Sequence, residues 1–336
     1  MSAVGASGPE SASVTLWRRL VGVQKRFPLL QLVALIAVFL YGAETLPGLA
    51  TWAAVKTILV FASLFGLAAT GQTLLILMGG FDLSVSGVIV ASALTVTALK
   101  TKYGLVFGEA LVIAVAAAAA LGAIAGQVCH RFKIQPLIVT LAMGTIALGI
   151  VQAQTNGLLA GSAPTWLLTL VSPRTKTFGI PVPPMVVIWA VVAILMGAFL
   201  HRTPAGRRLM ATGANPGGAE YSLIRTRRVW TLAFAFSAAA SALVGVLIGG
   251  FAGQVDSTIG DPYLFGSVVA VIVGGTVFGG PGDYTRTVLG ALFLEVVNIV
   301  MIGHNLGQAY QDIVYGVAIL FAVSLYGRER GLRDSI

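Results

Sequence analysis

Long apolar runs separated by short polar segments dominate the sequence. A transmembrane helix needs roughly 20 apolar residues, and about ten runs of suitable length can be marked off. The runs are continuous and do not alternate between apolar and polar positions, which favours membrane helices over a β-barrel. The expected spans are 29–46, 55–78, 84–99, 106–129, 135–153, 184–200, 229–252, 263–280, 286–303 and 308–326.

Two of these expected spans are weaker than the others. The span over 84–99 is short, and the span over 263–280 is rich in glycine. Either one fits a broken or partly re-entrant helix, which a membrane tolerates where neighbouring helices bury the backbone. We therefore predict an all-α integral membrane protein with about ten transmembrane helices.

Basic residues are divided unequally between the segments that connect these spans. If the N-terminus lies inside the cell, most of the 21 Lys and Arg residues fall on the cytoplasmic side. The exceptions on the outer side are Lys56, Lys100, Lys102, Arg174 and Lys176. Since cytoplasmic loops carry an excess of Lys and Arg, we predict that both termini are cytoplasmic. Residues 1–27 and 328–336 then form cytoplasmic tails around a single transmembrane domain over 28–327.

The composition agrees with a membrane protein, because 57% of the 336 residues are hydrophobic and only 10% are charged. Soluble domains contain about 25% charged residues. The net charge of +9 does not indicate a nucleic-acid partner, since the basic residues lie in short loops where membrane topology accounts for them. A single cysteine excludes an internal disulfide, and three scattered histidines do not have the spacing of a metal site.

The sequence contains no recognisable catalytic motif. A G-x-x-x-x-G-K-[ST] phosphate-binding loop is absent, so the chain is not expected to hydrolyse ATP itself. We expect neither enzymatic activity nor a cofactor in this chain. Any transport would then be driven by an ion gradient or by a separate subunit.

The most basic part of the chain is the polar segment HRTPAGRRLMATGANPGGAEYSLIRTRRVW, which starts at His201. Glu220 is its only acid, and its arginines are Arg202, Arg207, Arg208, Arg225, Arg227 and Arg228. A segment this polar cannot cross hydrocarbon, so we predict a cytoplasmic loop over 201–228. Two interpretations remain open: the loop docks a cytoplasmic protein, or it binds anionic lipid headgroups.

The centre of this loop has the sequence of a helix start. Asn215 suits the N-cap, and Pro216 suits the first helical position, where its missing N–H is not needed. We expect a short helix over about 217–224. Its contact surface would comprise Ala219, Tyr221 and Leu223.

Two glycine-rich segments stand out, one between the spans expected over 55–78 and 84–99 and one inside the span expected over 263–280. In the first, Gly79 and Gly80 permit a tight turn, and Asp82 can cap the following helix near Ser84. The second segment contains Gly274, Gly275, Gly279 and Gly280, which suit close packing or a hinge. A similar stripe of Gly245, Gly249 and Gly253 predicts a helix–helix contact.

Two further features concern the spans and the outer side. Glu295 lies near the middle of its span, with Asn298 placed as a hydrogen-bond partner, and we interpret it as a structural residue. The longest outer segment, about 154–183, is proline-rich and contains Trp166. It is either a short surface helix facing an external partner or an ordinary loop.

Four blocks of the chain together resemble the permease subunits of ABC-type importers for ribose, xylose, galactose and related monosaccharides, in the branched-chain-permease-like superfamily. The blocks are GGFDLSVSGVIV at 79–90, IQPLIVTLAMG at 134–144 followed by Thr155-Asn156-Gly157, TPAGRRLMATGANPGGA at 203–219 and VVAVIVGGTVFGGPGDYTRTVLGALFL at 268–294. The resemblance implies an all-helical permease domain that pairs as two copies in the bacterial plasma membrane. It also implies cytoplasmic ATPase subunits, which bind ATP and Mg²⁺, and an extracytoplasmic solute-binding protein.

The same resemblance assigns roles to residues of this chain. The segment that docks into the ATPase corresponds to Gly213, Ala214, Asn215, Pro216, Ala219 and Glu220. Candidates for the translocation pathway or its gate are Gly79, Gly80, Asp82, Ser84, Asn156, Gly274, Gly275, Gly279 and Gly280. Two departures stand out: Leu223 replaces a glycine that the family usually has, and Glu295 replaces a small or apolar residue. The rival function is an ion-coupled secondary transporter of a small polar solute.

Overall fold

The computed structural model describes residues 28–155, 164–252 and 255–331. The tail expected over 1–27 lies outside this range, and the last helix extends into the tail expected over 328–336. The described helices are α2 (Leu29–Thr45), α3 (Trp52–Leu77), α4 (Val85–Tyr103), α5 (Phe107–Phe132), α6 (Pro136–Thr155), α7 (Thr165–Val171), α8 (Pro184–Arg202), α9 (Pro204–Ala214), α10 (Pro216–Tyr221), α11 (Thr226–Ala252), α12 (Asp261–Val273), α13 (Tyr284–Gly303) and α14 (Gln308–Gly331).

Every expected span corresponds to a helix, but the helices differ in length. Among the described residues, six helices are long and apolar enough to cross a membrane by themselves, namely α3, α5, α6, α8, α11 and α13. Shorter apolar stretches lie in α2, α4 and α12. The chain is therefore a multi-pass, all-helical membrane protein, while the expected total of about ten crossings stays a prediction.

The span expected over 263–280 is wrong at its C-terminal end. Helix α12 ends at Val273, and the residues that follow form a loop before α13. Gly275 adopts a φ of 99° and Gly279 a φ of 55°, both in the left-handed region that interrupts a right-handed helix. The glycines therefore shorten this helix instead of continuing it.

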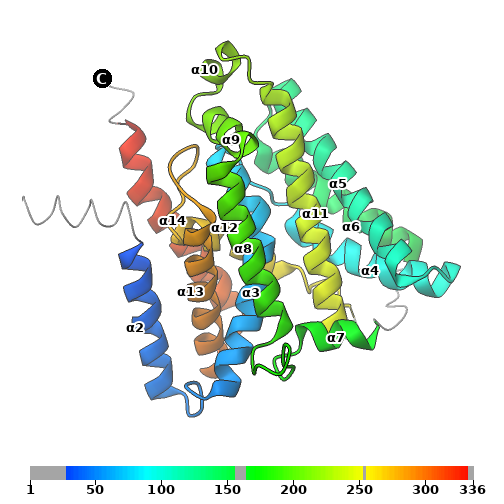
Figure 1. The fold of residues 1–336 in the computed structure, drawn as a ribbon, viewed down its shortest axis with the longest axis vertical. Coiled ribbons are helices and arrows are strands. Elements are labelled where there is room, and N and C mark those ends of the chain that lie inside the picture. The colour runs from blue at the N-terminus through cyan, green and yellow to red at the C-terminus, as the bar shows by residue number, and fades with distance from the viewer. Residues whose placement is uncertain (1–27, 156–163, 253–254, 332–336) are drawn as a thin grey trace, which may run out of the picture.

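Helices α3 and α11 form the centre of the bundle. Helix α11 packs against α3, α4 and α5, and α3 also packs against α12 and α13. In Figure 1, α2, α13 and α14 lie on one side of this centre, and α5 and α6 lie on the other. The helices with the most buried residues are thus those that contact the largest number of neighbours.

Small residues bring the backbones of these central helices close together. A Cβ atom added to Gly245 of α11 would lie 2.1 Å from the carbonyl oxygen of Ile89 in α4. A Cβ atom on Gly122 of α5 would lie 2.3 Å from the oxygen of Phe234 in α11. The contact predicted for Gly245 and Gly249 is confirmed against α4, whereas Gly253 lies outside the described residues. Such close approach is typical of membrane helices, which associate by packing.

The two ends of the bundle differ. Helices α9 and α10 lie at one end, and the short helix α7 lies at the opposite end (Figure 1). Helix α7 confirms a short surface helix in the proline-rich segment expected over 154–183, where Trp166 is exposed and its ring meets Phe107 edge-on at 5.2 Å. The place of this segment on the outer side stays a prediction. The basic helix α9 and the mainly apolar helix α7 therefore lie at opposite ends of the bundle.

Gly245→Ala should destabilise the protein, because the new methyl group overlaps a backbone oxygen that cannot move without shifting α4. We expect a loss of about 1–3 kcal/mol in the free energy of unfolding, the usual cost of overpacking. Thermal unfolding in detergent measures it. The matched control is Gly149→Ala in α6, where an added Cβ meets no atom within 4 Å. Equal melting temperatures for the two variants would contradict the proposed close packing.

Candidate functional site

The basic segment forms two helices and not one. Helix α9 was not expected, although Thr203 and Pro204 carry its start signal: the Thr203 hydroxyl oxygen accepts from the Gly206 N–H at 3.1 Å, and Pro204 is the first helical residue. Helix α10 begins as expected, because Asn215 is its N-cap and accepts from the Gly218 N–H at 2.8 Å. The segment is thus ordered through its own capping interactions.

Helix α10 ends at Tyr221, three residues before the expected end. Leu223 adopts a φ of 59°, and the Ile224 N–H donates to the Ala219 carbonyl at 3.0 Å, as in a helix end that usually contains glycine. A left-handed conformation costs a leucine roughly 1–2 kcal/mol. The turn after α10 therefore has the left-handed form that glycine usually adopts, and Leu223 adopts it with local strain.

Close packing and hydrogen bonds hold this segment against the bundle. A Cβ atom on Gly213 would lie 1.9 Å from the Leu77 carbonyl oxygen, so only glycine lets α9 contact the end of α3. The Thr226 hydroxyl donates to Glu220 at 2.8 Å and also lies 3.0 Å from Nε2 of His130. Glu220 therefore links α10 to the start of α11 and the end of α5.

The surface of α10 differs from the one expected. Ala219 is buried, so it packs against the bundle and cannot belong to a contact surface. Tyr221 and Leu223 are 93% and 91% exposed, and Ala214 and Pro216 are exposed as well. An exposed tyrosine and leucine between arginine-rich flanks form the part of this end that is suited to bind another protein.

A buried carboxylate marks the second candidate site. Asp82 does not cap α4, because the N-cap is Ser84 and no side-chain cap bond is formed. One oxygen of Asp82 accepts from the backbone N–H and the hydroxyl of Ser84, at 2.8 and 2.5 Å. The other oxygen accepts from the Ser237 hydroxyl of α11 at 2.8 Å. The expected cap is therefore wrong. The carboxylate accepts hydrogen bonds from Ser84, the residue before the first helical residue, and from Ser237 of α11, and it bonds no N–H group within α4.

The backbone around Asp82 is bonded just as fully. The Gln72 side chain of α3 accepts from the Asp82 N–H at 3.0 Å and donates to the Asp82 carbonyl and to Ser267 of α12. The Leu83 N–H donates to the Thr140 hydroxyl of α6 at 2.9 Å. Residues 82–84, which precede α4, are thus bonded to α3, α6 and α11, and Gln72 extends this network to α12. We call residues 82–84 the central junction. Polar side chains within apolar runs were the only sequence signal for these partners.

The two glycine-rich segments meet at the end of α3 that is near α9. Gly79 adopts a φ of 85°, the Gly279 N–H donates to the Ile76 carbonyl at 2.8 Å, and the rings of Phe81 and Phe278 meet edge-on at 5.9 Å. Added Cβ atoms would lie 2.2 Å from the Arg286 oxygen at Gly274 and 3.1 Å from Val277 at Gly280. Gly79 and Gly279 are thus brought together, whereas Asn156 lies outside the described residues.

Glu295 is buried at 5% exposure, in the interior of the bundle. Its side chain is hydrogen-bonded to Asn298, which also accepts from the Tyr315 hydroxyl at 2.7 Å. The expected Asn298 partner is therefore confirmed. Across the described ranges, no group of three or more His, Cys, Asp and Glu side chains is placed to hold a metal ion.

The apolar helical bundle with its ordered polar end is that of a multi-pass membrane protein, and the comparison with known families makes it a permease. The chain belongs to the family described as "Branched-chain amino acid transport system / permease component", which it matches over residues 54–323. The expected resemblance to sugar-importer permeases is confirmed as well. No solved structure matches the chain.

Several curated relatives cover most of the chain. The ribose import permease protein of Bacillus subtilis is 30% identical over 262 residues, which is 77% of this chain and 80% of that protein. The L-arabinose transport system permease protein of Escherichia coli is 30% identical over 301 residues, 87% and 88% of the two chains. The fructose import permease protein of Rhizobium meliloti is 27% identical over 273 residues, 80% and 76%.

Asp82→Ala should destabilise the bundle, because it leaves the donors of Ser84 and Ser237 buried without an acceptor. We expect the free energy of unfolding to fall by about 3 kcal/mol, and Ser237→Ala, which removes one donor, to cost about 1 kcal/mol. Thermal unfolding in detergent compares them with Asp256→Ala, which alters an exposed acid in a loop. If Asp82→Ala melts at the same temperature as Asp256→Ala, the central junction does not hold the helices together.

Proposed function

We propose that the chain is the permease subunit of an ATP-driven importer in the bacterial plasma membrane, which moves a monosaccharide or sugar alcohol into the cytoplasm by alternating access. Membership of the permease family carries this proposal, together with relatives named for ribose, L-arabinose and fructose import. Both termini and the α9–α10 end would face the cytoplasm, as the distribution of basic residues favours. The permease itself would need no catalytic residues and no cofactor.

The partners follow from the same proposal. Two copies of the chain would pair, an extracytoplasmic solute-binding protein would deliver the sugar, and cytoplasmic ATPase subunits would bind ATP and Mg²⁺. Exposure of Tyr221 and Leu223 supports α10 as the element that enters the ATPase. Gly213 of α9 and Glu220 of α10 would transmit movement of this end, because Gly213 packs α9 against α3 and Glu220 bonds α10 to the start of α11.

The central junction is a suitable gate for alternating access. It breaks the helical path between α3 and α4 inside the bundle, and the loop between α12 and α13 packs against the adjoining glycines. Because glycine adopts left-handed conformations at no steric cost, the backbone would bend at these glycines, and the helices bonded to the central junction would move with it. The proposed residues of the translocation pathway or its gate remain Gly79, Gly80, Asp82, Ser84, Asn156, Gly274, Gly275, Gly279 and Gly280.

An ion-coupled secondary transporter is the alternative function, and Glu295 would be its coupling residue.

After reconstitution with the ATPase and binding protein, we expect ATP-dependent uptake of a labelled monosaccharide, tested with ribose, arabinose and fructose. Glu295→Gln should retain at least about half of this uptake, because an amide can keep the bond to Asn298. Uptake by the permease alone, driven by a proton or sodium gradient and abolished by Glu295→Gln, would establish the alternative.

Docking on α10 is tested separately from transport. Tyr221→Asp with Leu223→Asp should weaken ATPase binding in a pull-down at least about tenfold, since both changes put charge on an exposed apolar contact. The control is Phe178→Asp, which alters a 99% exposed aromatic residue between α7 and α8. Insertion into the membrane and melting temperature should be unchanged in all variants. Equal ATPase binding by the two sets of variants would place the docking site elsewhere.

A further inference from the structure

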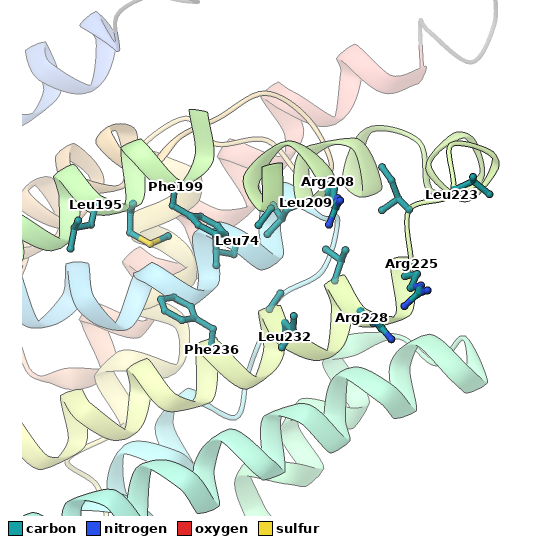
Figure 2. A pocket seen from close by; sticks show the side chains of 15 residues that line it. Leu74, Leu195, Phe199, Arg208, Leu209, Leu223, Arg225, Arg228, Leu232 and Phe236 are labelled. Atoms are coloured by element: carbon teal, nitrogen blue, oxygen red, sulfur yellow. The ribbon is translucent and has the colours of Figure 1, made fainter. Parts of the chain in front are cut away.

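An open groove runs beside the basic segment, between α8 and α9 on one side and α11 on the other (Figure 2). Its volume is about 830 Å³, within the range of roughly 300–1,000 Å³ that is typical of ligand sites. It lies outside the central junction and outside the gate residues. The proposed coupling and gate roles do not explain why the protein has a groove at this place.

The chemistry of the groove changes along its length. Figure 2 shows Arg208, Arg225 and Arg228 gathered at one end, and Leu195 and Phe236 at the other. All three arginines are exposed, and none forms an ion pair with an acid among the described residues. The floor between the two ends is apolar and includes Leu74, Met196, Leu209 and Ala233. One end of the groove thus suits an anion, and the rest suits a hydrocarbon chain.

The basic and apolar ends of the groove lie in the same order as the headgroup and acyl chains of a lipid in one leaflet. Helix α11 starts at Thr226, so Arg225 and Arg228 lie at its membrane boundary, and Phe236 lies about 12 Å deeper than Arg228. Helix α8 ends at Arg202, and Leu195 lies about 10 Å deeper than that end. The charges therefore lie at headgroup level and the apolar walls at acyl-chain level.

We propose that this groove binds one anionic glycerophospholipid. Its phosphate would accept hydrogen bonds from Arg208, Arg225 and Arg228, and one acyl chain would lie against Leu195, Phe199 and Leu232. Charge complementarity selects the lipid, since unpaired arginines between transmembrane helices are typical of sites for anionic headgroups. A soluble anion would leave the apolar walls uncovered, although Leu195 is 61% and Leu232 is 68% exposed.

The occupant would also brace the docking element. Leu223 and Ile224, at the exit of α10, line the same groove as the arginines. A lipid there fills the space between α10 and α11 at the membrane boundary. This consequence rests on the proposed function, whereas the lipid site itself does not.

Native mass spectrometry of the full-length chain in detergent tests the site with phosphatidylglycerol, phosphatidylcholine and inorganic phosphate as probes. Arg208→Gln/Arg225→Gln/Arg228→Gln should weaken phosphatidylglycerol binding at least about tenfold. The matched control, Arg202→Gln/Arg207→Gln/Arg227→Gln, removes the same charge from the same segment but outside the groove. We expect it to change binding less than about twofold. Equal weakening by both triple variants would show attraction to the whole basic segment and overturn the site.

A second variant tests the apolar part of the groove. Leu195→Trp/Leu232→Trp fills the groove without changing its charge and should also weaken phosphatidylglycerol binding, with the melting temperature unchanged. Phosphatidylcholine should bind at least about tenfold more weakly than phosphatidylglycerol to the unaltered chain. Full competition by inorganic phosphate with no effect of the tryptophans would show a headgroup-only site, and release of the lipid on binding the ATPase would show a protein interface. Either result would overturn the lipid proposal.

Discussion

The buried carboxylate of Asp82 is the constraint on which the arrangement of the central helices depends. A charge or a polar backbone group inside a membrane protein needs hydrogen-bond partners, because lipid supplies none. Residues 82–84 meet this requirement through side chains of three different helices, α3, α6 and α11, and the Gln72 side chain of α3 also donates to Ser267 of α12. The break between α3 and α4 is therefore possible only where these helices converge. Helix α4 starts inside the bundle for the same reason.

The same end of α3 connects this constraint to the polar end of the molecule. Its last turn contacts Gly213 of α9 and accepts a hydrogen bond from Gly279, in the loop that precedes α13. A displacement of α9 would thus be transmitted through the end of α3 to both glycine-rich segments, because no flexible linker separates them. In the proposed importer, this contact offers a direct mechanical path from an ATPase on α10 through α9 and α3 to the gate.

Part of this arrangement could be predicted from the sequence. Apolar runs of suitable length predicted the helices, and the preferences of Asn215 and Pro216 predicted the N-cap and the first position of α10. The sequence did not predict the roles of residues that contact neighbours far away in the chain. Ala219 was expected on the surface but is buried against the bundle, and Asp82 was expected to cap α4 but bonds Ser237, 155 positions further along the chain. Helix α9 was missed although its Thr203-Pro204 start signal was present.

The sequence by itself determined the class of protein, the membrane helices and the chemistry of the basic segment, because hydropathy, charge and capping act over a few neighbouring residues. Only the tertiary structure decided which polar groups share a hydrogen bond, which glycines require close backbones and which arginines border a groove. These properties depend on distances between helices that are far apart in sequence. A local sequence pattern carries no information on such distances, because they depend on how the whole bundle packs.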